Sequence, residues 1–162
     1  MINIMFVCLG NICRSPTAHG VCEALIREKG LQHSIQCHSS GTSDWHIGKL
    51  PDERAIKAAS QRGYDLTQLR AEQINAHSDF EQLDYILPMD NANMADLQQV
   101  VPADFKGKLA LFLDYHPDAA LNEVPDPYYG GEEGFTPVLE MIETACNNLL
   151  AEIIDNHQLK SR

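Results

Sequence analysis

A run of seven residues near the start of the chain most constrains its fold. Residues 2–8, INIMFVC, are almost continuously apolar, which is typical of a strand buried on both faces. A short loop leads to Arg14, after which Ser15 is predicted to cap a helix and Pro16 suits its first turn. Gly30 is predicted to end this helix. The chain therefore opens as strand, tight loop and helix.

The same alternation continues to the end of the chain. Strands separated by helices predict a parallel sheet with right-handed crossovers. The length of 162 residues fits one domain, which we predict over 1–162. We expect an α/β fold in three layers, a doubly wound sheet of four parallel strands flanked by helices on both faces. The further predicted strands are 35–40, 84–89 and 108–113; the further helices are 51–63, 94–99 and 136–153, the last capped by Thr136 and Pro137.

The net charge of −11 limits the partners of the chain. Nucleic acids and anionic lipids bind through clustered Lys and Arg, so we expect neither a nucleic-acid partner nor a membrane partner. No segment approaches the run of about 20 apolar residues that spans a bilayer. The first residues lack the features of a signal peptide. We therefore expect a cytoplasmic protein.

The five cysteines support a reducing compartment. Their number is odd, and their spacing is not that of a secreted disulfide scaffold. Cys22, Cys37 and Cys146 lie in apolar or strand patterns, where we expect small buried hydrophobic side chains. The other two, Cys8 and Cys13, lie at the first loop.

In that loop, five residues separate Cys8 from Arg14. A loop of this length, between a strand and a helix N-terminus, can turn successive N–H groups inward to bind a phosphate. The same groups favour a thiolate at Cys8, the form that acts as a nucleophile. Arg14 offers a planar fork for two phosphate oxygens. The Ser15 hydroxyl can also donate to the Cys8 sulfur. The predicted phosphate-binding residues are Leu9, Gly10, Asn11, Ile12, Cys13, Arg14 and Ser15, with Gly10 and Asn11 suited to a left-handed or closely packed backbone.

Other interpretations of these residues compete. Cys8 and Arg14 can be a core cysteine and a surface arginine. A zinc site at Cys8 and Cys13 lacks a second ligand pair, and no nucleotide-binding G-x-x-x-x-G-K-[ST] loop is present, so we expect no metal and no cofactor. Asp126 lies between two prolines and suits either a turn or a general acid with fixed aim. Trp45 suits either ordinary packing or the rim of an aromatic site.

Three segments resemble one known family. Residues 7–16, VCLGNICRSP, are similar to the signature loop of the low-molecular-weight protein tyrosine phosphatases. Residues 43–45 and 51–52 resemble the specificity loop of that family and the segment after it. Residues 124–129, VPDPYY, resemble its general-acid loop, and Met89 and Asp90 resemble the end of its third strand. The resemblance runs in order from the first strand to the last helix.

The resemblance implies a two-step, metal-independent phosphate transfer. Cys8 would attack phosphorus while Asp126 protonates the leaving oxygen, and water would then attack with Asp126 as base. Arg14 would stabilise the charge on the phosphoryl oxygens. Asp90 and Asn93 would be supports. The residues that would grip the aromatic ring of the substrate are Leu9, Trp45, Tyr128 and Tyr129, with His46 beside them.

Partners and regulation follow from the same residues. The implied partner is a phosphotyrosine protein, and the chain is expected to be mainly a monomer, with weak self-association through Tyr128 and Tyr129. Cys8 is expected to oxidise reversibly, with Cys13 as the resolving thiol. The competing interpretation is that Cys13 only packs under the loop.

The chain also departs from the family. Many relatives have His near Gln68, Arg near Glu72 and Ser in place of Ala92, which puts in doubt how the signature loop is supported here. Two alternatives stay open. An arsenate reductase of the same fold needs a further cysteine pair, and only Cys146 follows Cys37. A non-catalytic phosphate-binding module would keep Arg14 without needing a nucleophile and an acid together.

Overall fold

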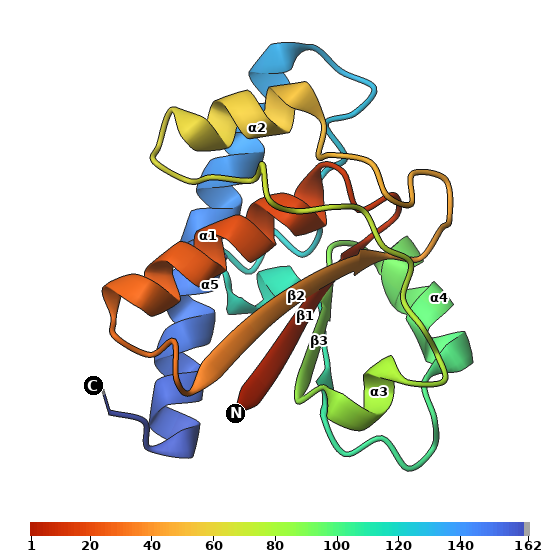
Figure 1. The fold of residues 1–162 in the computed structure, drawn as a ribbon, viewed down its shortest axis with the longest axis vertical. Helices are drawn as coiled ribbons and strands as arrows, with labels where there is room; N and C mark the ends of the chain where they lie inside the picture. The colour runs from red at the N-terminus through yellow and green to blue at the C-terminus, as the bar shows by residue number, and fades with distance from the viewer. Residues whose placement is uncertain (161–162) are drawn as a thin grey trace.

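The computed structural model describes residues 1–160, and it contains one four-stranded sheet (Figure 1). The last two residues of the domain predicted over 1–162 lie outside this range. Neighbouring strands are parallel throughout, in the order β2-β1-β3-β4. The strands are β1 (Ile2–Cys8), β2 (Ile35–Gly41), β3 (Tyr85–Pro88) and β4 (Lys108–Leu109).

Helices cover both faces of the sheet, so the predicted fold class is confirmed (Figure 1). Alternate residues of β1 belong to different cores: Phe6 packs with the α1 and α5 side, and Val7 packs with the α3 and α4 side. This alternation explains why the run is apolar at successive positions. The helices are α1 (Arg14–Glu28), α3 (Asp79–Gln82), α4 (Asn91–Val100) and α5 (Phe135–His157).

One further helix, α2 (Glu53–Ser60), lies over the N-terminal ends of α1 and α5 (Figure 1). Asp52 caps it by accepting a hydrogen bond from the backbone N–H of Arg54 at 2.9 Å. Its inner face contributes Ala55 and Ala59 to a third, smaller core under the first loop, which also contains Cys13, Leu66 and Phe135. The first loop is therefore supported from below by apolar contacts.

Three local predictions were wrong. β4 has two residues, because the apolar segment after it enters a short 3₁₀ helix, η1 (Phe112–Tyr115). Phe112 in this helix packs edge-on against Phe6, with 5.2 Å between the ring centroids. The apolar pattern of this segment therefore reflects packing against the core and not a strand. Ser15 lies inside α1 and does not cap it. The N-cap of α5 is Gly134, ahead of Thr136, and no side chain caps that helix.

The sheet topology creates a crevice at the carboxyl ends of β1 and β3. The chain leaves β1 toward α1 on one face, whereas it leaves β3 toward α4 on the opposite face. Ligands of doubly wound sheets bind at such a switch point. The loop between β1 and α1 lies at this place.

Candidate active site

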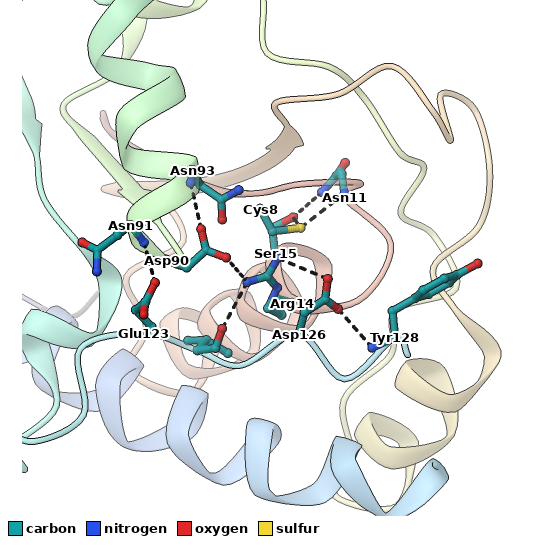
Figure 2. Close-up of polar contacts among 11 residues, drawn as sticks. Cys8, Asn11, Arg14, Ser15, Asp90, Asn91, Asn93, Glu123, Asp126 and Tyr128 are labelled. Atoms are coloured by element: carbon teal, nitrogen blue, oxygen red, sulfur yellow. Dashed lines mark hydrogen bonds and ion pairs between the residues drawn. The ribbon is translucent and has the colours of Figure 1, made fainter. Parts of the chain in front are cut away.

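The first loop wraps around the sulfur of Cys8 (Figure 2). The Asn11 N–H donates to Cys8 Sγ at 3.3 Å, and Ser15 Oγ lies 3.0 Å from the same atom. Asn11 takes the left-handed conformation, with φ of 55°, which asparagine tolerates better than most residues. Two donors therefore face a thiolate at Cys8 and would stabilise its charge.

The carbonyl groups of Cys8 and Leu9 face the chain that follows β2. The Cys8 carbonyl accepts from the backbone N–H of Thr42 at 2.9 Å, and the Leu9 carbonyl accepts from that of Ser43 at 3.0 Å. In a trans peptide the next N–H points opposite to the carbonyl. The N–H groups of Leu9 and Gly10 therefore point away from the segment that holds these carbonyls. This is the arrangement that an anion-binding loop needs.

A buried polar network holds the loop in this shape. Asn11 Nδ2 donates to Ser15 Oγ at 2.7 Å, and Asn11 Oδ1 accepts from the backbone N–H of Glu72 at 2.9 Å. The contact at Glu72 uses the main chain, so it does not depend on the Glu72 side chain, which differs from the residue of the family that the sequence resembles. The other two departures, Gln68 and Ala92, are exposed. The loop is thus supported without the residues that relatives carry there.

Arg14 is buried, and its side chain is fixed by Asp90, just after β3, and by the main chain at Val124. Its Nη1 donates to Asp90 Oδ2 at 2.6 Å and to the Val124 carbonyl at 3.1 Å. Burial lowers the pKa of Arg14, but the Cys8 charge and the Asp90 and Asp126 carboxylates outweigh it, so the pKa is raised. The guanidinium thus keeps its charge. Asp90 also caps α4, because its Oδ1 accepts from the Asn93 N–H at 2.8 Å.

Asp126 lies beside the Arg14 guanidinium (Figure 2). Its Oδ1 accepts from the Tyr128 N–H at 3.0 Å, and its Oδ2 lies 3.6 Å from Arg14 Nη2. The Asp126 side chain is 32% exposed, so solvent reaches it. One oxygen is therefore held by the main chain while the other faces the phosphate site.

One pocket collects the predicted catalytic and specificity residues. Trp45 and Tyr129 form an exposed rim, at 61% and 81% exposure. His46 packs over Gly10, where a Cβ would stand only 2.9 Å from its ring, so Gly10 serves close packing while Asn11 takes the left-handed turn. Of the predicted phosphate-binding residues, Asn11 and Ser15 are buried outside the lining. The lining residues are Cys8, Leu9, Gly10, Ile12, Cys13, Arg14, Trp45, His46, Asp126, Tyr128 and Tyr129.

Comparison with known proteins identifies the family. A family model described as low molecular weight phosphotyrosine protein phosphatase matches residues 3–159. The chain belongs to this family. The phosphatase is 38% identical to YfkJ, a low molecular weight protein-tyrosine-phosphatase of Bacillus subtilis, over 98% of this chain and 100% of YfkJ. It is 36% identical to the low molecular weight phosphotyrosine protein phosphatase of Schizosaccharomyces pombe, over 94% of this chain and 97% of that one.

Solved structures agree with this assignment. The crystal structure of a protein tyrosine phosphatase from Entamoeba histolytica, with Hepes in its active site, superposes on the phosphatase with a TM-score of 0.91. The two are 38% identical, and the match covers 98% of this chain and 100% of that one. Membership decides between the alternatives that the sequence left open. The protein is a tyrosine phosphatase of low molecular weight, rather than an arsenate reductase or a non-catalytic module.

The three cysteines outside the first loop are buried, as predicted. Cys22, Cys37 and Cys146 are all buried in the main core. Cys13 is also buried; burial raises the pKa of its thiol, and the charges of Asp52, Cys8 and Asp126 raise it further. Cys13 is therefore a neutral thiol at physiological pH. Within residues 1–160, no helix is long and apolar enough to cross a membrane.

Sequence reasoning missed two supports of the site in the phosphatase. Gly41, at the end of β2, leaves no room for a side chain, because a Cβ would stand 2.7 Å from the Leu9 carbonyl oxygen. Arg54 joins α2 to the segment that carries Asp126. A strand-end glycine was a usable signal for the first. Nothing local in the sequence marked Arg54.

Proposed function

We propose that this phosphatase hydrolyses phosphotyrosine in proteins, and small aryl phosphate esters, through a cysteinyl-phosphate formed on Cys8. The observation that carries the proposal is the convergence of Cys8, Arg14 and Asp126 in one aromatic-walled pocket. A nucleophile, a cationic clamp and an acid are the three groups that this reaction needs.

In the first step the Cys8 thiolate attacks phosphorus and the bond to the phenolic oxygen breaks. Arg14 and the N–H groups of the loop bind the three other oxygens and stabilise their charge in the transition state. Asp126, protonated on Oδ2, gives its proton to the leaving oxygen. Tyr128 and Tyr129 contact the departing ring.

In the second step water replaces the sulfur. Asp126, now a carboxylate, takes a proton from the attacking water, and the P–S bond breaks to give inorganic phosphate. The thiolate returns to the Asn11 N–H and the Ser15 hydroxyl, which stabilise it as a leaving group. This chemistry draws its charge stabilisation from protein groups and calls for no metal or cofactor.

The cellular setting is part of the same proposal. A net charge of −11 fits a cytoplasmic protein whose partners are phosphotyrosine proteins, rather than nucleic acid or membrane. The exposed rings of Tyr128 and Tyr129 support weak self-association of a protein that is mainly monomeric. Equilibrium sedimentation over a range of concentrations tests the oligomeric state, and a stable dimer at low concentration would contradict it.

Cys13 supplies reversible protection of the nucleophile. Peroxide converts the Cys8 thiolate to a sulfenic acid and releases hydroxide; Cys13 then condenses with it to a disulfide and releases water. The raised pKa of Cys13 slows this second step, because the thiolate is the attacking form. Activity lost to peroxide should return with dithiothreitol in the wild type. Cys13→Ser should recover less, and equal recovery would limit Cys13 to packing.

The test of the proposed function compares two cysteine variants. Cys8→Ser should abolish hydrolysis of p-nitrophenyl phosphate and of a phosphotyrosine peptide. Cys37→Ser changes a buried thiol of β2 that lies outside the pocket and should stay active. Retained activity in Cys8→Ser would refute the role of Cys8.

A further inference from the structure

Arg54 holds two parts of the molecule together from outside the pocket. It lies in the first turn of α2, and its Nε and Nη2 donate to the two carboxylate oxygens of Asp52 at 3.0 and 2.9 Å. Asp52 is itself fixed as the cap of α2. This paired contact sets the plane of the guanidinium.

The other donors of Arg54 reach the segment that carries Asp126. Nη2 donates to the Tyr128 carbonyl at 2.9 Å, and Nη1 donates to the Gly130 carbonyl at 2.9 Å. The guanidinium carbon also lies 4.7 Å from the centre of the Phe135 ring and 5.7 Å from that of Tyr128. Arg54 thus binds two carbonyls and lies beside two aromatic rings, of which Tyr128 is a wall of the pocket.

The peptide groups of Tyr128 connect Arg54 to the proposed acid. The Tyr128 carbonyl accepts from Arg54 Nη2. The Tyr128 N–H donates to Asp126 Oδ1 at 3.0 Å (Figure 2). With Oδ1 held, Oδ2 of Asp126 is the oxygen that faces Arg14. Displacement of Tyr128 would therefore change the aim of the oxygen that carries the proton.

We propose that Arg54 is a positioning residue for the general acid and for the Tyr128 wall. It anchors residues 126–130 to the capped start of α2, so that Asp126 Oδ2 is already oriented toward the leaving oxygen when the substrate binds. The inference rests on the acid role proposed for Asp126. Arg54 itself acts through Tyr128 and does not touch the substrate.

A merely structural role makes a different prediction. Surface ion pairs contribute little to stability and partly covered ones somewhat more; the Arg54 and Asp52 side chains are 30% and 12% exposed. Arg62, past the end of α2, is a matched control: it pairs with Glu140 and Glu143 of α5 at 2.8 and 2.7 Å and is 38% exposed. If Arg54 is only a surface contact, its loss should resemble the loss of Arg62.

The experiment compares Arg54→Ala, Arg54→Lys and Arg62→Ala for kcat, KM and Tm, with phenyl phosphate and p-nitrophenyl phosphate as substrates. A misplaced catalytic group costs up to about 100-fold, so Arg54→Ala should lower kcat for phenyl phosphate about 10- to 100-fold and for the nitrophenyl ester less. Lysine lacks the planar guanidinium fork, so Arg54→Lys should not restore the kcat of the wild type. Arg62→Ala should change kcat less than about 2-fold.

A double variant separates this inference from the function on which it rests. If Arg54 acts through Asp126, Arg54→Ala should lower kcat little further in an Asp126→Asn background. Equal effects of Arg54→Ala and Arg62→Ala, or full additivity with Asp126→Asn, would overturn the role of Arg54 alone. Normal activity of Asp126→Asn would instead overturn the acid role, and this inference with it.

Discussion

Asp90→Asn tests how the phosphate clamp is held. Asp90 uses one oxygen for Arg14 and the other for the N–H of Asn93 at the start of α4. Asparagine has a single side-chain oxygen, so it can keep only one of these contacts, and it leaves the buried guanidinium without its nearest charge. A hydrogen bond to a charged group contributes about 1.5–3 kcal/mol. We expect Asp90→Asn to lower the free energy of unfolding by about 2 kcal/mol.

For a chain of this size, 2 kcal/mol corresponds to about 4–8 °C in Tm. Calorimetry without phosphate measures this loss, and added phosphate should recover part of it, because the anion supplies the charge that Arg14 has lost. The kcat for p-nitrophenyl phosphate should also fall about 10-fold, because the clamp loses its orientation. Asp96→Asn, an exposed position on the same helix, is the control. An Asp90→Asn protein with the Tm and kcat of Asp96→Asn would refute the reasoning.

Three further predictions follow from the same contacts. Asp126→Asn should slow phenyl phosphate hydrolysis about 10²–10⁴-fold and the nitrophenyl ester less, since the poorer leaving group needs the proton more; equal losses measured in parallel would remove Asp126 as the acid. Gly41→Ala should lower the free energy of unfolding by about 1–3 kcal/mol in urea titrations and impair kcat, because its Cβ meets the Leu9 carbonyl; unchanged values would contradict the close approach. The hydrogen bonds and charge of Arg54 lower the pKa of Asp52 in the folded protein. The stabilisation that they give is therefore present above about pH 3.9, the pKa of Asp52 in the unfolded chain, and is lost as the pH falls through its pKa in the folded protein. Asp52→Asn should flatten that part of the curve of unfolding free energy against pH, and a curve parallel to that of the wild type would contradict the prediction.

The opening of the chain was predictable because each level of its sequence agrees. The apolar run, the turn residues and the helix pattern all specify strand, loop and helix. The spacing of Cys8 and Arg14 then predicted a phosphate-binding loop with a nucleophilic cysteine. Segment 110–113 was misread because an apolar run is equally compatible with a strand and with a buried 3₁₀ turn. Ser15 was misread because its hydroxyl faces Cys8 and Asn11 instead of a free helix N–H.

The supports of the site were harder to predict, because they join residues far apart in the chain. Asp90 and Arg54 each meet their partners only after the sheet and α2 are in place. No local pattern encodes such a contact. Asp90 was identified only through the family resemblance, and Arg54 was not identified at all.

The central claim is that Cys8 carries the phosphoryl group between the two steps. The most direct measurement mixes the phosphatase rapidly with p-nitrophenyl phosphate, quenches the reaction in acid, and locates the modified peptide by mass spectrometry. We predict one phosphoryl group on the Cys8 sulfur, formed as fast as the first burst of nitrophenolate and absent from Cys8→Ser. A phosphoryl group on another residue, or steady turnover with Cys8 unmodified throughout, would contradict the account.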